Sequence, residues 1–334
     1  MNNDIVVSVM ITYYNQKQYI KDSLGSVLSQ KTNFKYEVLC GDDGSSDGTY
    51  EELLKWQEKY PGVCKVFQMP RETGVKYEPI VRASNNRHNL LKHAEGKYVT
   101  ILDGDDYYTD DNKLQAQADI LENHPDCAAC CHPMRMVWED CDRAPEFIGK
   151  LSDRSFELSN KVYWSALWLP AEAFLFRNYY KGKEDAINKD FFDDNLITIY
   201  FIKYGNIIYT PKSMVDYRQH SESSWNSRSD IQKAYVNMLL YQESKKILPE
   251  MKWQCFSRCR GVWRVFYDHR KEDLKVDNGS RFVVTEKMYL DSLRYRTSSK
   301  GYQLKYILKY FVPCHMGKVF SVFFRLQKLT YRYL

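Results

Sequence analysis

The chain has 334 residues, of which 44% are hydrophobic and 27% charged, and its formal net charge is +5 at pH 7. This composition excludes a disordered chain, and the length allows two domains or one large domain with an appendage. No stretch reaches the ~18 apolar residues of a membrane-spanning helix, and no signal-peptide pattern opens the sequence. We therefore expect a cytoplasmic protein.

The first half of the chain alternates β-type runs with helical patterns. This order, at this spacing, is typical of βαβ units and predicts an α/β fold with a mainly parallel sheet. The predicted strands are 5–11, 36–40 and 64–69, and the predicted helices are 20–28, 50–59 and 80–94.

An acidic cluster follows a further β-type run at 99–102. Asp103, Asp105 and Asp106 stand there around Gly104. Ligands of open α/β sheets bind at the carboxyl ends of the strands, and Mg²⁺ or Mn²⁺ commonly takes one or two carboxylates plus nucleotide phosphates. The pattern therefore predicts a metal-assisted phosphate site. The alternative is an acidic turn with solvated side chains.

A second acidic pair, Asp42 and Asp43, follows the second predicted strand and should lie at the same sheet edge. The sequence has no GxGxxG after its first strand and no GxxxxGK[ST]. Neither a dinucleotide site nor a P-loop is therefore indicated, and a metal would have to help hold the phosphates.

The cysteines admit two interpretations. Cys127, Cys130, Cys131 and Cys141 lie near His132, which allows a zinc site. Their spacing is not a paired CxxC motif, and the segment also matches a buried strand in which cysteine acts as a small hydrophobic residue. We favour the strand, with most of the nine cysteines as free thiols.

Three motifs occur in order along the chain: SVMITYYNQKQYIKDSLGSVLSQ, EVLCGDDGSSDGT and NRHNLLKHAEGKYVTILDGDDYY. Together they resemble the inverting glycosyltransferase family 2, and the resemblance extends over about residues 5–225. It implies the GT-A fold and a nucleotide-sugar donor, UDP-linked by expectation, with Mn²⁺ or Mg²⁺ as cofactor. The implied acceptor is a glycan or a lipid-linked sugar of bacterial surface polysaccharide assembly.

The resemblance implies a nucleoside site in the loops after the first two strands. Its residues would be Thr12, Tyr14, Asn15, Asp42, Asp43 and Ser45. Carboxylates suit this role because they accept hydrogen bonds from base N–H groups and ribose hydroxyls. The alternative for 42–49 is a turn that caps the next helix through Ser46 or Asp47, and both can be true.

The acidic cluster matches the DxD motif of the family. Asp103 and Gly104 would lie against the nucleotide, and the metal would be held by Asp105, our first choice, or Asp106. Arg87 matches a basic residue that lies near the nucleotide in the family, and its fork of donors suits a diphosphate. The alternative for Arg87 is an exposed helix position.

The resemblance implies a general base in the second half of the chain. Asp193 and Asp194 resemble the acidic pair that opens a helix in the family, and Asp194 would take the proton from the attacking hydroxyl. The alternative is a carboxylate favoured by the helix dipole. In DYRQHSESS, His220 would approach the metal or the diphosphate with support from Arg218. The alternative is a packed histidine.

We expect three parts: a nucleotide-sugar-binding half (1–112), an acceptor-binding half (113–228) and a helical basic extension (229–334). Residues 301–334 contain six Lys or Arg, many aromatic residues and no acid. Such a stretch is typical of peripheral contact with an anionic membrane, at the inner face of the cell membrane. The alternative is packing on the catalytic domain. No nucleic-acid-binding module accompanies the charge, so we expect no nucleic acid partner.

Two other functions remain open. A sugar nucleotidyltransferase would share the sheet and the metal but would not need Asp194. A non-catalytic nucleotide-binding scaffold would bind the donor without turnover. Processive members of the family carry a QxxRW motif and membrane spans, which this sequence lacks, so we expect transfer of single sugars.

Overall fold

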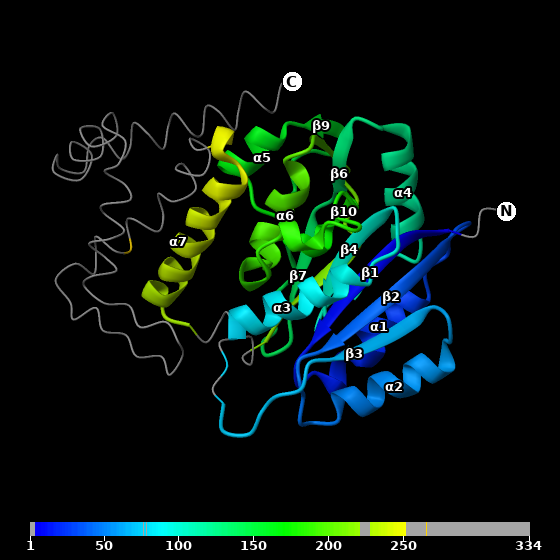
Figure 1. Ribbon diagram of the computed structural model, residues 1–334. Helices are drawn as coiled ribbons and strands as arrows, with labels where there is room; N and C mark the ends of the chain where they lie inside the picture. The colour runs from blue at the N-terminus through cyan, green and yellow to red at the C-terminus, as the bar shows by residue number, and fades with distance from the viewer. Residues whose placement is uncertain (1–3, 76, 78, 221–227, 252–264, 266–334) are drawn as a thin grey trace. The chain divides into compact units, whose positions relative to one another are not determined.

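The computed structural model describes residues 4–75, 77, 79–220, 228–251 and 265 (Figure 1). The chain divides into two compact units, 1–263 and 264–334, and the description below concerns the first. Most of the predicted helical extension, including the basic stretch 301–334 with its expected membrane contact, lies outside the described residues. Among the residues that are described, no helix is both long and apolar enough to cross a bilayer.

A large mixed sheet forms the centre of the unit, with the strand order β3-β2-β1-β4-β10-β6-β11-β9 (Figure 1). Strands β1 to β4 are parallel to one another, whereas β10 runs antiparallel to both β4 and β6. This confirms the expected α/β fold. The strands are β1 (Ile5–Tyr13), β2 (Lys35–Asp42), β3 (Cys64–Gln68), β4 (Tyr98–Asp103), β6 (Cys127–Cys131), β9 (Phe156–Leu158), β10 (Phe174–Arg177) and β11 (Asn206–Tyr209).

The register of β1 places the functional loops side by side. Thr12 pairs with Asp103 on one neighbouring strand, and Tyr13 pairs with Asp42 on the other. Both acidic loops therefore leave the same edge of the sheet, as predicted.

A smaller sheet begins directly after the loop that contains Asp105 and Asp106. Its order is β5-β12-β7-β8, from strands Tyr107–Tyr108, Val215–Gln219, Met134–Trp138 and Glu146–Ile148. The sequence patterns did not separate these short strands from irregular chain. The expected strand of cysteines is confirmed, because β6 buries Cys127, Cys130 and Cys131.

The helices are α1 (Ile20–Leu28), α2 (Thr49–Lys59), α3 (Pro79–Lys92), α4 (Lys113–Asn123), α5 (Asn160–Ala166), α6 (Asp194–Ile202) and α7 (Asp230–Ile247). The helices predicted at 20–28, 50–59 and 80–94 agree with α1, α2 and α3 within a few residues, whereas α5 was not predicted. Short 3₁₀ turns include η1 (Lys17–Tyr19), η2 (Ala171–Ala173), η3 (Glu184–Ala186) and η4 (Lys189–Phe191). The N-cap of α2 is Gly48 at φ 89°, not Ser46 or Asp47, although Asp47 accepts a hydrogen bond from the Thr49 N–H (2.9 Å).

A lysine is fully buried at the start of α4. Lys113 donates a hydrogen bond to Gln117 (2.7 Å), and its Nζ lies 4.5 Å from the ring centre of Tyr108. Burial lowers the pKa of Lys113 to about 7, and the nearby Cys130 and Glu172 offset only part of this effect. The folded protein therefore binds this proton less tightly than the unfolded chain does.

We expect Lys113→Met to raise the free energy of unfolding by about 1–3 kcal/mol at pH 6, because a buried charge is replaced by an apolar side chain of similar size. Below pH 7 both states hold the proton, so the full cost of burying the charge is present. Between pH 7 and the ordinary lysine pKa the folded state loses its proton first, and the cost fades. Urea unfolding at pH 6, 8 and 10 should show a shrinking difference between variant and wild type. A difference independent of pH would contradict this.

Candidate active site

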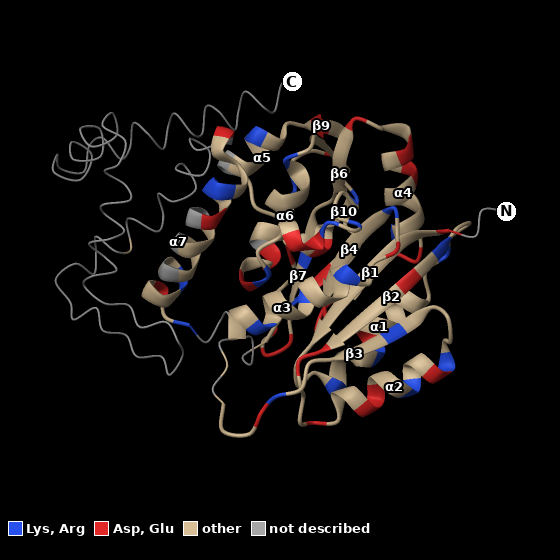
Figure 2. Cartoon of the chain, viewed as in Figure 1, with Lys and Arg blue, Asp and Glu red and all other residues tan. Residues whose placement is uncertain are grey.

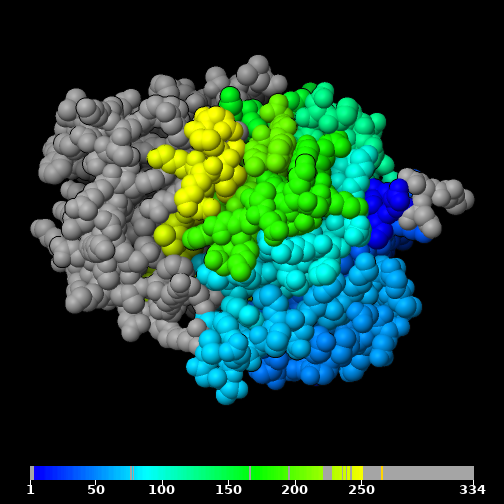
Figure 3. Space-filling view, in the orientation of Figure 1, coloured from blue at the N-terminus to red at the C-terminus, as the bar shows by residue number. Residues whose placement is uncertain are grey.

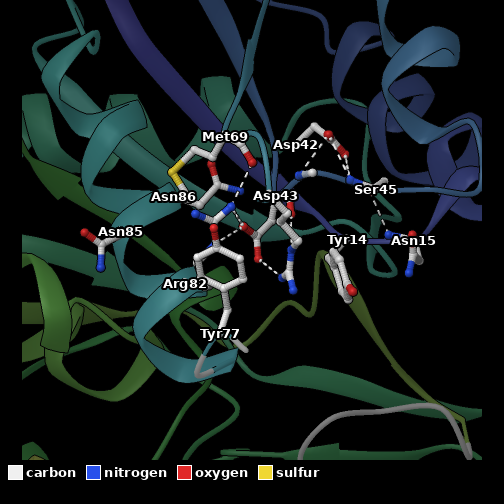
Figure 4. Close-up of polar contacts among 12 residues, drawn as sticks. Tyr14, Asn15, Asp42, Asp43, Ser45, Met69, Tyr77, Arg82, Asn85 and Asn86 are labelled. Carbon is white, nitrogen blue, oxygen red and sulfur yellow. Dashed lines mark hydrogen bonds and ion pairs between the residues drawn. The ribbon is translucent and has the colours of Figure 1, made fainter. Parts of the chain in front are cut away.

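The loops after β1 and β2 hold each other in place. Asn15, at φ 51°, donates its backbone N–H to Ser45 Oγ (2.9 Å) and accepts at Oδ1 from the Ser46 N–H (2.8 Å). The Lys17 N–H donates to Asp47 Oδ2 (3.0 Å). Figure 4 shows Asn15 facing Ser45 across this junction. The predicted nucleoside loops thus form one hydrogen-bonded unit.

Asp42 shapes the second of these loops. Its buried carboxylate accepts hydrogen bonds from the backbone N–H groups of Gly44 (3.1 Å) and Ser45 (3.2 Å). Gly44 lies at φ 70°, where glycine is favoured. The Asp42 carboxylate therefore faces its own turn.

Asp43 lies between two arginines (Figure 4). Arg71 Nη2 is 2.6 Å from Oδ2, and Arg82 Nε is 2.6 Å from Oδ1. Burial raises the pKa of Asp43, and the two guanidinium groups offset part of this effect. This pair of arginines, which the sequence patterns did not single out, holds the Asp43 carboxylate beside the predicted nucleoside loops.

Aromatic rings cover the same arginines. The Arg71 guanidinium carbon lies 4.0 Å from the centre of the Tyr14 ring, and that of Arg82 lies 4.7 Å from the centre of the Tyr77 ring. Tyr14 is 46% exposed. Asp43 thus lies beside flat, partly exposed faces of the kind on which a planar base can stack.

Arg87 points into the acidic cluster and is not an exposed helix residue, since it is only 7% exposed. Its Nη2 lies 2.7 Å from Asp103 Oδ1, which also accepts from the Thr12 hydroxyl (3.3 Å). Although burial opposes the charge, the carboxylates of Asp103, Asp194 and Glu172 raise the pKa of Arg87. Arg87 is therefore ion-paired with Asp103 and is affected by acidic residues of two further segments.

Asp105 and Asp106 have different surroundings. Asp105 Oδ2 lies 2.9 Å from His220 Nε2, whereas Asp106 is 1% exposed and accepts the Arg218 backbone N–H at Oδ1 (2.7 Å). Burial and then Asp105 raise the pKa of Asp106. No described residue hydrogen-bonds to Asp106 Oδ2. Asp106 therefore links the acidic loop to β12, while Asp105 pairs with the predicted histidine.

The Arg218 side chain is held by other acidic residues. Its guanidinium bonds to Glu139 (2.5 Å) and Asp22 (3.1 Å) and lies 4.6 Å from the centre of the Tyr19 ring. A diphosphate would have to compete with both carboxylates. The structure thus places the backbone of Arg218, and not its side chain, in the acidic cluster.

Glu172 is a site residue that sequence reasoning missed. It is 2% exposed in η2, and Oε2 has no hydrogen-bond partner among the described residues. Burial, Asp103 and Asp194 raise its pKa. The available signal was an acid within the apolar run PAEAFLF, where a charge is costly to bury without a partner.

The two acidic residues at the start of α6, Asp193 and Asp194, have different roles. Asp193 is the N-cap and accepts the Leu196 N–H (2.9 Å). Asp194 is therefore not needed as the cap, and its charge acts on Arg87 and Glu172. In Figure 2, acidic residues in red lie at the beginning of α6, next to basic residues in blue on α3.

The donor set fits a metal that shares its ligands with a nucleotide. No three His, Cys, Asp or Glu side chains of the described ranges are grouped to hold an ion by themselves. Asp105 and His220 offer one carboxylate and one imidazole, and Asp106 Oδ2 is a buried oxygen with no partner among those ranges. Mg²⁺ and Mn²⁺ sites commonly take one or two carboxylates and complete their shell with phosphates and water.

Comparison with known proteins identifies the family. The model of "Glycosyl transferase family 2" matches residues 8–177, about half of the chain. The chain belongs to this family. It is therefore a glycosyltransferase, as the sequence motifs indicated. The matched range contains both acidic loops, Arg87 and Glu172, and ends at the last residue of β10.

Two relatives illustrate the range of the family. The uncharacterized protein Mb1547 of Mycobacterium bovis is 29% identical over 285 residues, which cover 84% of this chain and 74% of that protein. The poly(ribitol-phosphate) β-N-acetylglucosaminyltransferase TarS of Staphylococcus aureus is 35% identical over 122 residues, 36% of this chain and 19% of TarS.

Two solved structures of glycosyltransferases share the fold. TarS 1–349 of S. aureus in complex with UDP-GlcNAc has a TM-score of 0.54 at 22% identity, over 86% of this chain and 80% of that one. The mannosyltransferase PcManGT of Pyrobaculum calidifontis, in complex with GDP-Man and Mn²⁺, has a TM-score of 0.51 at 16% identity, over 91% and 83% of the two chains. These similarities confirm the expected GT-A fold.

Proposed function

We propose that this glycosyltransferase moves one sugar from a UDP-sugar to a hydroxyl of a glycan or lipid-linked acceptor, in a single inverting displacement. The observation that carries the proposal is the ion pair of Arg87 with Asp103, from the DxD motif, together with the electrostatic effect of Asp194, from the start of α6, on the same guanidinium. A candidate phosphate-binding motif and a candidate base thus both act on one arginine.

The surroundings of Asp43 support a uracil-containing donor. A carboxylate accepts a hydrogen bond from an N–H of the base, and the Tyr14 ring offers a face for stacking. TarS, which shares the fold, has been solved with UDP-GlcNAc. Thr12, Asn15 and Ser45 complete the proposed nucleoside site.

The proposed chemistry gives Asp194 and Arg87 separate roles. Asp194 takes the proton of the acceptor hydroxyl as its oxygen attacks the anomeric carbon from the face opposite the leaving group. Retention by double displacement would require a nucleophile as well as a base. Arg87, which pairs with Asp103, would donate hydrogen bonds to the departing diphosphate.

Asp105 and His220 would hold Mn²⁺ or Mg²⁺ together with the diphosphate, while Asp106 fixes the acidic loop on β12. When bound, the metal supplies positive charge for the leaving phosphates. The division into halves at residue 112 and the membrane contact of the extension remain predictions.

Release of nucleoside diphosphate from a panel of UDP-, GDP- and TDP-sugars tests the proposal. We expect release from one UDP-sugar, dependent on Mn²⁺ or Mg²⁺ and abolished by EDTA, with lipid-linked acceptors added to increase turnover. Release of pyrophosphate from a sugar phosphate and a nucleoside triphosphate would instead favour a nucleotidyltransferase. Binding of UDP-sugars without release under any acceptor condition would favour a scaffold.

A further inference from the structure

The segment before Asp194 is held by a chain of hydrogen bonds that begins on α7. Glu243 Oε1 accepts a hydrogen bond from Asn188 Nδ2 (3.1 Å). Asn188 Oδ1 in turn accepts from the Asp190 N–H (3.2 Å), and the Asn188 N–H donates to the Tyr200 hydroxyl on α6 (3.0 Å). Helices α6 and α7 pack side by side (Figures 1 and 3). Segment 188–190 is therefore attached to both helices.

The same segment is attached to α3 on its other side. Asp190 Oδ1 accepts a hydrogen bond from Asn85 Nδ2 (3.0 Å), and the Asn85 amide also bonds to the Val81 carbonyl (2.7 Å). In Figure 4, Asn85 points away from Asp43 and the nucleoside loops. Since α3 also carries Arg87, the two sides of the proposed active site are joined through Asp190.

Glu243 is an unusual residue to bury for helix packing alone. It is 7% exposed, and its two oxygens have separate partners. Oε2 pairs with Lys246 (2.7 Å), whose side chain is 73% exposed, whereas Oε1 is directed at Asn188. An apolar side chain would satisfy the packing of α7 on α6. The Asn188 amide needs a hydrogen-bond acceptor here, whereas the exposed Lys246 could be hydrated instead.

We propose that Glu243 is a positioning residue for the catalytic base. Through Asn188 it fixes the turn that precedes α6, and so sets where the Asp194 carboxylate meets the acceptor hydroxyl. A small displacement of a reacting group is enough to slow a displacement reaction strongly. This inference rests on the proposed function, because it takes Asp194 as the base. If Glu243 positions the base, then α7, at the start of the predicted extension, contributes to catalysis.

Steady-state kinetics of the full chain, with the UDP-sugar that the panel identifies, tests the proposal. We expect Glu243→Ala to lower kcat about tenfold and to leave the KM of the donor within about twofold, since the nucleoside site is untouched. Glu243→Gln keeps an acceptor oxygen and should restore most of kcat. Asn188→Ala should match Glu243→Ala, with no further loss in the double variant. Lys246→Ala, which removes only the partner of Oε2, is the matched control and should leave kcat unchanged.

Hydrogen–deuterium exchange gives a measurement that needs no turnover. In Glu243→Ala the backbone amides of 188–197 should exchange about tenfold faster, while those of β1 and β4 keep their protection. Three outcomes would each overturn the inference. The first is unchanged kcat and unchanged exchange in Glu243→Ala, and the second is failure of Glu243→Gln to restore kcat. The third is loss of protection in β1 and β4 as well. If Asp194→Asn abolishes transfer and Glu243→Ala does not change it, only this inference fails. If Asp194→Asn retains transfer, the proposed function fails.

Discussion

Asp194→Asn is expected to lower kcat for sugar transfer by about 10³-fold, within the range that a positioned general base contributes. The variant keeps the size of the side chain but cannot accept the proton of the acceptor hydroxyl. The Asp193 cap on Leu196 is unaffected, so α6 should begin at the same residue. Affinity for UDP, measured by calorimetry, should stay within about twofold because the nucleoside site is built from other elements.

Asp193→Asn is the matched control for this prediction. Asparagine caps helices about as well as aspartate, so the variant should fold with the same α6 and keep transfer within a few-fold of wild type. If Asp194→Asn retained more than about one tenth of kcat, a base contribution would be excluded. If Asp193→Asn were the inactive variant, the roles of the two residues would have to be exchanged.

Asp105→Ala is expected to lower metal-dependent transfer by about 10²-fold or more, and EDTA should do the same to the wild type. Asp105 is the carboxylate that pairs with His220, and its loss removes one of the two proposed protein ligands. Titration with Mn²⁺ should show that the variant needs more metal for half-maximal rate. Asp111→Ala, which changes an exposed carboxylate paired with Lys31, is the surface control.

Stability measurements should separate Asp105 from Asp106. Asp106→Ala leaves the buried backbone N–H of Arg218 without its acceptor, so we expect the free energy of unfolding to fall by about 1–3 kcal/mol. Asp105→Ala breaks a partly exposed contact and should change stability much less. Equal losses of stability in the two variants would contradict the assignment of Asp105 as ligand and Asp106 as structural link.

The parallel half of the fold could be predicted from the sequence because its elements carry local signals. Apolar runs ended in acidic loops at βαβ spacing, and parallel pairing then required Asp42 and Asp103 to lie at one edge. The small sheet β5-β12-β7-β8 could not be predicted in this way. Its strands, such as Glu146–Ile148, are too short for an alternating pattern to be distinguished from irregular chain.

The directions in which side chains point were the least predictable feature of the site. Motif matching predicted that Arg218 supports His220 at the metal or the diphosphate, but its side chain is held by Asp22 and Glu139, which lie far from it in sequence. Glu172 reaches the site only because β10 is inserted antiparallel between β4 and β6. Non-local pairings of this kind leave no periodic signal in a single sequence.

The mutual hydrogen bonds of the loops after β1 and β2 have a consequence for the thermodynamics of donor binding. Asn15 and Ser45 are ordered by each other before any nucleotide arrives, so the conformational entropy of these loops is lost on folding and not on binding. A donor then meets a surface already close to its bound shape. Its association should resemble lock-and-key docking at this end of the molecule, and any slow closure must come from elsewhere in the chain.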